Sequence, residues 1–232
     1  KYTRKGSHVL INNILREVPH VVDGVFTPLL IILIEIITFI FIFTLLIWYE
    51  PMGTMFVCFF FGLYGFLYHS IFSKKTKLAG EIRADNEKKG SAQIIQSING
   101  LKEIKLWIKE NFFIKKFNSS LLKVSRAHTV GTTFIELPKA ITEVVGIIAF
   151  CILVTAFTQN TTDASTIIIK LGFFGAAGLR LMPLINRIMS AIHLIKFYYP
   201  NVDLIINEFS DFEKNKLISS SKEINTITDF KS

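Results

Sequence analysis

Three basic side chains and one acid lie deep within long apolar stretches of the sequence, where a charge is costly unless it faces protein or water. The bases are Lys139, Arg180 and Arg187, and the acid is Glu35. Arg180 and Arg187 are seven positions apart, so a helix places them on one face. A guanidinium can donate two parallel hydrogen bonds to phosphate or carboxylate oxygens. We therefore predict that Lys139, Arg180 and Arg187 form a basic ladder that binds a phosphate or another anion.

A structural role for these charges is also open. Glu136 and Glu143 lie three positions before and four positions after Lys139, so either carboxylate can neutralise its charge within one helix. Arg187 can instead meet lipid head groups. Lys170 is close enough to the end of its apolar stretch for its ammonium group to extend out of the membrane. Anion binding is thus one of two interpretations of these bases.

Glu35 lies about 15 Å into the first apolar stretch, at about 1.5 Å per residue of helix. One interpretation is a site for a proton or a cation. The other is an ion pair with a base on another helix, for which Lys139 and Arg180 are the candidates.

The sequence contains no motif for catalysis or nucleotide binding. It lacks the glycine-rich phosphate loop, the Gly-x-Ser-x-Gly turn, the His-Glu-x-x-His motif and the dinucleotide-binding glycine pattern. The histidines have no metal-ligand spacing, and the cysteines lie in apolar stretches where we expect them to be buried; these residues are His8, His20, His69, His128, His193, Cys58 and Cys151. We predict no catalytic site, no metal and no cofactor in this chain.

The elements that position the charges are predicted to be membrane-spanning helices. The chain has 232 residues, half of them hydrophobic at 50%, with 22 Phe and a mean hydropathy of +0.45, which is too apolar for an ordinary soluble domain. The net charge is +8, but the basic stretches adjoin apolar ones, so contact with anionic lipid explains it and nucleic acid is not expected. We predict an all-α polytopic bundle with four spans, at residues 25–49, 52–72, 138–157 and 164–195.

Residues 73–133 form a polar block that is rich in lysine and free of proline. Such a block is retained in the cytoplasm, so both termini are expected inside and both short loops outside. The simplest form for it is a hairpin of two long helices joined by a short turn. Lys1 to His20 has the pattern of an amphipathic helix, and the helix after the fourth span is expected to end near Phe212, before a linker at residues 213–232.

Several stretches resemble the transmembrane domain of an ATP-binding cassette exporter of type 1. Residues 6–24 resemble its first intracellular loop. The run from Asn99 to Lys105, followed by Glu110 to Phe117, resembles the end of the fourth family helix and the second coupling helix. Residues 179–184 and 186–188 resemble the middle of the sixth family helix. The likeness covers almost the whole chain.

This resemblance implies that residues 1–212 form part of an exporter domain containing family helices three to six, in a homodimer. Residues 213–232 would then lead to a nucleotide-binding domain that lies outside this chain, with Ile227 to Lys231 as its first strand. ATP and Mg²⁺ would bind to that domain, and the parent protein would hydrolyse ATP. Contacts with the nucleotide-binding domains, of the same parent chain and of the opposite subunit, are implied for Ile11, Asn12, Asn13, Glu110, Asn111, Phe112 and Phe113.

Within the family, Leu-Arg-Leu-Met-Pro with Asn-Arg-Ile, together with Leu137-Pro138-Lys139, resembles bacterial flippases for lipid-linked oligosaccharides. The likeness implies the bacterial inner membrane and an undecaprenyl-pyrophosphate-linked glycan, whose anionic head group would meet the basic ladder. Lys139 keeps a positive charge but lacks the guanidinium fork. An exporter of peptides or drugs, a membrane signalling or scaffold protein, and a lipid-modifying membrane enzyme are the alternatives.

Overall fold

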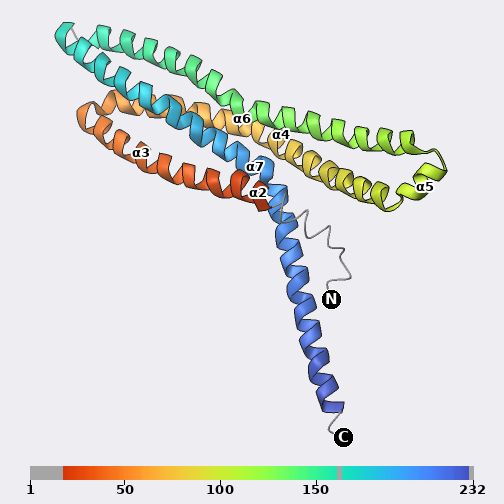
Figure 1. The fold of residues 1–232 in the computed structure, drawn as a ribbon. Helices are drawn as coiled ribbons and strands as arrows, with labels where there is room; N and C mark the ends of the chain where they lie inside the picture. The colour runs from red at the N-terminus through yellow and green to blue at the C-terminus, as the bar shows by residue number, and fades with distance from the viewer. Residues whose placement is uncertain (1–17, 161–163, 230–232) are drawn as a thin grey trace.

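The computed structural model describes residues 18–160 and 164–229, with side chains placed up to Ile206 except at Asn160 and Leu204. Its elements are helices: α2 (Val18–Val21), the π-helix η2 (Val22–Phe26), α3 (Thr27–Tyr49), α4 (Pro51–Asn99), α5 (Leu101–Leu106), α6 (Glu110–Asn160) and α7 (Ala164–Asp229). Helix α3 and parts of α4, α6 and α7 lie side by side as a bundle (Figure 1). The predicted helix at Lys1 to His20 lies mostly outside the described residues.

Four of these helices are long and apolar enough to cross a membrane, namely Val18–Tyr49, Pro51–Asn99, Glu110–Gln159 and Ala164–Asp203. Large apolar side chains such as Phe41, Phe59 and Ile147 are exposed along them. A soluble protein rarely exposes so much apolar surface, whereas lipid hydrocarbon accommodates it. The prediction of an all-α bundle that contains four helices long and apolar enough to cross a membrane is therefore confirmed. Cys58 and Cys151 are exposed on this surface, so the expectation that they are buried is wrong.

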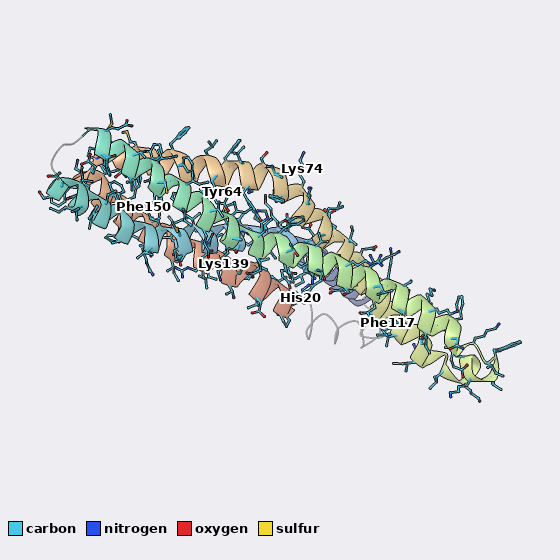
Figure 2. All side chains as sticks on the ribbon, turned by 90° about the horizontal axis from the view of Figure 1, so that it is seen from above. His20, Tyr64, Lys74, Phe117, Lys139 and Phe150 are labelled. Carbon is cyan, nitrogen blue, oxygen red and sulfur yellow. The ribbon has the colours of Figure 1, made fainter. Side chains whose placement is uncertain are left out.

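Helices α4 and α6 continue without a break beyond the bundle and form a two-helix hairpin, with α5 at its far end (Figure 1). Phe117 lies well out along this hairpin, while Tyr64, Lys139 and Phe150 lie in the bundle (Figure 2). The chain reverses after α5 at Ile108, which has a positive φ of 50° that β-branched residues rarely adopt. The two-helix form predicted for residues 73–133 is present.

Helix α6 runs straight through Pro138, where the third span was expected to begin. Proline has no N–H, so the carbonyl of Phe134, four residues earlier, loses its helical donor. The hydroxyl of Tyr68 on α4 donates to that carbonyl instead, at 2.8 Å. A second tyrosine, Tyr64, donates to the carbonyl of Pro138 at 3.2 Å. Tyr68 of α4 thus replaces the missing backbone bond and allows the helix to continue.

Helix α7 extends further than expected. The sequence predicted that the helix ends near Phe212 and that residues 213–232 form a linker with a strand at Ile227 to Lys231, but α7 remains helical to Asp229. Neither proline nor glycine follows Pro200, so no strong helix breaker is present. The last part of α7 leaves the bundle and runs on alone (Figure 1).

The packed interior of the bundle consists of three clusters along its axis. Leu46, Phe157 and Phe174 form one near the short connections, and Tyr64, Tyr68 and Met189 form the middle one, while Phe197 packs with Ala79 and Ile135 toward the hairpin. Two glycines let α7 approach closely at this third cluster. A Cβ at Gly80 would lie 2.2 Å from the carbonyl oxygen of Phe197, and one at Gly131 would lie 2.1 Å from its ring.

Candidate functional site

An ion pair between α3 and α7 holds one member of the basic ladder. The Nε atom of Arg187 lies 2.5 Å from Oε1 of Glu35. Glu35 is buried, Arg187 is about half exposed, and Oε2 of Glu35 has no hydrogen-bond partner among the described residues. The sequence offered Lys139 or Arg180 as partners for Glu35, but the packing of α3 on α7 brings Arg187 there instead.

Arg180 lies on α7 with its side chain exposed, and it makes no ion pair with any described residue. The residues that share this face are small, since Gly172, Ala176 and Pro183 are also exposed there. A charge within a membrane-spanning helix should meet protein or water rather than lipid. This face of α7 is therefore suited to another protein surface or to a water-filled space.

Lys139 is exposed on α6, in the bundle (Figure 2). Glu136 and Glu143 are exposed too, and in the described part of the chain neither carboxylate pairs with Lys139. The predicted neutralisation within the helix is thus not seen. Lys139 and Arg180 are exposed, whereas Arg187 pairs with Glu35. Anion binding by the three bases stays a prediction.

Lys170 is held at the far end of α7 by Glu50, in the connection between α3 and α4. Its Nζ atom lies 2.8 Å from Oε2 of Glu50 and 5.5 Å from the centre of the Phe157 ring. The partner is next to the end of α3, so Lys170 reaches toward the end of the bundle as expected. Its charge is neutralised and does not belong to the basic ladder.

Four of the seven residues implied as contacts for a nucleotide-binding domain lie at the start of α6. Asn111 and Phe112 are exposed, while Glu110 and Phe113 are partly buried. The other three, Ile11, Asn12 and Asn13, lie outside the described residues. Their role stays a prediction.

The far end of the hairpin carries an apolar surface of which the sequence analysis identified only Phe112. Trp107 is 75% exposed and Ile108 is 82% exposed, with Leu106 and Phe112 beside them in sequence and also exposed. We call Leu106, Trp107, Ile108 and Phe112 the apolar tip. A Trp-Ile pair within a lysine-rich polar block was the signal that could have revealed it.

A buried arginine joins the hairpin to α7 and was also missed. Arg83 is 1% exposed, and its Nη2 atom donates to Oδ1 of Asn201 at 2.6 Å. Its guanidinium lies 4.3 Å from the ring centre of Tyr198 and 4.8 Å from that of Phe197. Glu87 supplies a carboxylate at 3.5 Å. We call this set the Arg83 junction; in the sequence, Arg83 is one of many bases in the polar block and carries no mark of burial.

Two histidines that are far apart in the sequence meet between α4 and α7. The rings of His69 and His193 have centres 6.2 Å apart, and Nδ1 of the fully buried His193 lies 2.9 Å from Oγ1 of Thr76. The Nζ atom of Lys196 lies 2.9 Å from Nε2 of His69 and donates to the Ser73 hydroxyl. Among the described residues, no group of three or more His, Cys, Asp or Glu side chains is placed to hold a metal.

No protein-family model matches the chain. The likeness to exporters therefore remains a resemblance that is carried by the motifs quoted above. A proposal for the function must therefore rest on the contacts described above at the hairpin, at α7 and in the bundle.

Proposed function

We propose that this chain is the membrane part of an ATP-driven exporter or flippase, in which the hairpin transmits motion from a nucleotide-binding domain to the membrane helices. The apolar tip is the observation that carries the proposal. It places Trp107 and Ile108, both largely exposed, at the far end of a lysine-rich hairpin. An exposed apolar patch with a polar rim is typical of a surface that binds another protein.

The position of the apolar tip supports a protein partner rather than lipid. From Ser73 to Asn99, α4 extends about 40 Å past its apolar part, at about 1.5 Å per residue. The tip is therefore too far from the spans to enter the same bilayer. In the proposed function it binds a nucleotide-binding domain in the cytoplasm, which supplies the ATP and Mg²⁺ site.

The hairpin is built to pass on a movement. Helices α4 and α6 are continuous from the tip into the bundle, so a displacement at one end moves the other without an intervening loop. The Arg83 junction ties α4 to α7, and α7 carries Arg180 and Arg187. Motion of the tip would thus reach the helix that bears Arg180 and Arg187 of the basic ladder.

The charge of that face supports an anionic, amphipathic substrate. Arg180 is exposed in a membrane-spanning helix, beside a stripe of small residues. A second copy of the chain facing it would enclose a polar space, and arginines lining that space would bind a pyrophosphate through paired hydrogen bonds. A lipid-linked oligosaccharide has such a head group and is the substrate that we propose.

The proposal is tested with the protein expressed from its complete gene and reconstituted in vesicles. Wild type should move a fluorescent pyrophosphate-linked lipid across the bilayer in the presence of ATP and Mg²⁺. Replacing Trp107 and Ile108 together by alanine should abolish this movement, because the tip no longer binds the partner domain. The helix content should stay unchanged. Leu122→Ala, at an exposed leucine on the stem of the hairpin, is the matched control and should retain movement.

Two results would contradict the proposal. The first is full lipid movement by the variant with both tip substitutions. The second is wild-type protein that binds a partner through the tip but moves no lipid when ATP is added. That result would favour a signalling or scaffold protein.

A further inference from the structure

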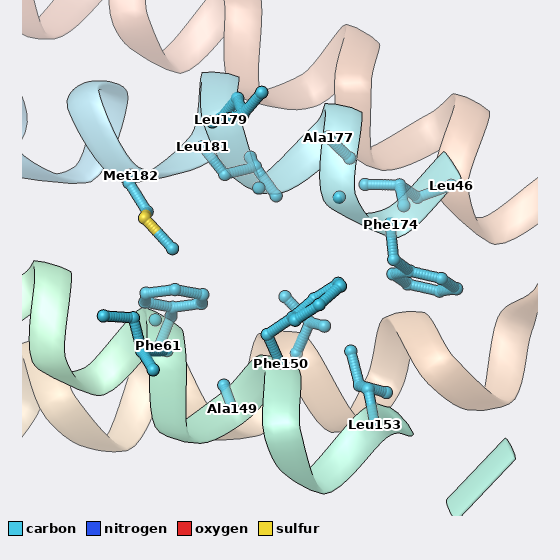
Figure 3. A pocket seen from close by; sticks show the side chains of 15 residues that line it. Leu46, Phe61, Ala149, Phe150, Leu153, Phe174, Ala177, Leu179, Leu181 and Met182 are labelled. Atoms are coloured by element: carbon cyan, nitrogen blue, oxygen red, sulfur yellow. The ribbon is translucent and has the colours of Figure 1, made fainter. Parts of the chain in front are cut away.

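An apolar cavity of about 380 Å³ lies within the bundle, near the end that carries the short connections. Residues from all four long helices line it, including Leu46 on α3, Phe61 on α4, Leu153 on α6 and Phe174 on α7 (Figure 3). Every lining side chain is apolar, or absent where the residue is glycine. None of the three bases of the basic ladder lines it, so this cavity is separate from the site proposed for the anion.

The cavity opens between α6 and α7. Leu179 is 79% exposed and Ile147 is 62% exposed, although both line the cavity, so they lie at its mouth. Ala149 is only 3% exposed and Leu153 only 5%, which places them inside (Figure 3). The mouth is continuous with the apolar surface of the membrane-spanning helices, where lipid hydrocarbon is the surrounding medium.

Glycines make the space. A Cβ at Gly178 would meet no atom within 4 Å, and one at Gly175 would meet only the ring of Phe150, at 3.8 Å. Both positions are on the side of α7 that faces α6, so the missing side chains leave a slot between the two helices. A larger residue at Gly178 has room to enter that slot without a clash.

The volume fits a hydrocarbon chain. An apolar cavity of about 150 Å³ holds benzene, so the 380 Å³ found here corresponds to roughly fifteen carbon atoms. Water would find no hydrogen-bond partner on these walls. If the cavity were empty, the side chains that line it would lack dispersion contacts on that side.

We infer that this cavity is a binding site for one acyl chain of a bilayer phospholipid, which enters between Ile147 and Leu179. The inference depends on the membrane setting of the four helices and not on transport. A chain in this slot would fill the space between α6 and α7 and thus join the two helices through lipid. The site accepts the acyl chain of a phospholipid with any head group, because no polar side chain lines the cavity.

The test maps lipid contacts by photochemical labelling. The protein is placed in vesicles of phosphatidylethanolamine and phosphatidylglycerol that contain a trace of phospholipid with a diazirine at the middle of one acyl chain. After illumination, mass spectrometry should find the label on Ala149 and Leu153, which are buried and reachable only from inside the cavity. Label confined to exposed residues such as Ile147 and Leu179 would overturn the inference. The same holds if another protein segment covers the mouth and thereby keeps the label from Ala149 and Leu153.

A pair of glycine variants makes the test specific. Gly178→Leu fills the slot, so labelling of Ala149 and Leu153 should be lost. Gly172→Leu introduces the same side chain on the same helix, at an exposed position that does not line the cavity and where a Cβ also meets nothing within 4 Å. It should leave the labelling unchanged. Undiminished labelling of Ala149 in a folded Gly178→Leu protein would also overturn the inference, and if that variant does not fold, the wild-type map still decides.

Discussion

Tyr68 shows how one hydroxyl makes a proline acceptable within a membrane-spanning helix. Pro138 leaves the carbonyl of Phe134 without its backbone donor, and Tyr68 supplies a replacement at 2.8 Å. Water cannot take this role inside a bilayer, so the carbonyl has to be satisfied by protein. The hydroxyl also fixes α4 against α6 at one register, since the donor and the acceptor lie on different helices.

We predict that Tyr68→Phe lowers the free energy of unfolding by about 1–3 kcal/mol, the cost of leaving a buried acceptor unsatisfied. Unfolding in mixed detergent micelles, followed by circular dichroism, measures the change. Tyr49→Phe is the control, because Tyr49 is exposed and its hydroxyl forms no hydrogen bond with the described residues. An equal loss in the two variants would show that the hydroxyl of Tyr68 does not support the proline.

At the scale of helices, the Arg83 junction joins the hairpin to α7. A buried guanidinium is costly unless its hydrogen bonds and its charge are matched. Asn201 accepts one bond, Glu87 supplies a carboxylate, and the rings of Phe197 and Tyr198 cover the faces of the guanidinium. Because these partners lie on α4 and α7, the junction ties the hairpin to α7.

We predict that Arg83→Ala lowers the free energy of unfolding by about 3–5 kcal/mol, since it breaks a buried ion pair and removes the hydrogen bond to Asn201 that joins α4 to α7. ATP-driven lipid movement should fall more than ATP hydrolysis, because the hairpin no longer carries α7 with it. Both rates are measured in the same vesicles. Lys89→Ala is the control: Lys89 pairs with Asp85 on the surface of the same helix, where such a pair contributes about 0–1 kcal/mol. Equal losses in movement and hydrolysis would indicate a purely structural junction.

At the scale of the whole molecule, one chain presents Arg180 on an open face rather than in an enclosed site. The exposed stripe of α7 and the exposed Lys139 on α6 both require a facing surface if they are to bind an anion within the membrane. A second copy of the chain meets this need in the proposed function. Arg187 is already engaged by Glu35, so of the two ladder bases on α7 Arg180 is the one without an ion-pair partner among the described residues.

We predict that Arg180→Gln abolishes the stimulation of ATP hydrolysis by a pyrophosphate-linked lipid and leaves the basal rate and the assembly unchanged. The amide cannot replace the charge and the fork of the guanidinium. Lys170→Gln, on the same helix, should retain stimulation, since Lys170 is neutralised by Glu50. Normal stimulation in Arg180→Gln would leave only a structural role for this base.

Hydropathy and charge along the chain were sufficient to predict four apolar helices and the polar two-helix block between them. Hydropathy and charge are both summed over neighbouring residues. Whether a helix inserts into lipid depends mainly on its summed hydropathy and on the charges that flank it. The long extent of α7 was missed because the polar stretch after Phe212 is a local signal of an end. In α6, the hydroxyl of Tyr68 on α4 replaces the backbone donor that Pro138 removes, so the helix continues.

The partners of the charges came from packing. Glu35 meets Arg187 rather than Lys139 or Arg180, and Arg83 is buried although it lies in a basic, polar stretch. The lipid-facing cavity likewise depends on glycines that come to face α6. Such contacts follow from the rotation and the axial register of one helix against another. These are set by the fit of side chains from segments far apart in the chain, a property that no local pattern contains.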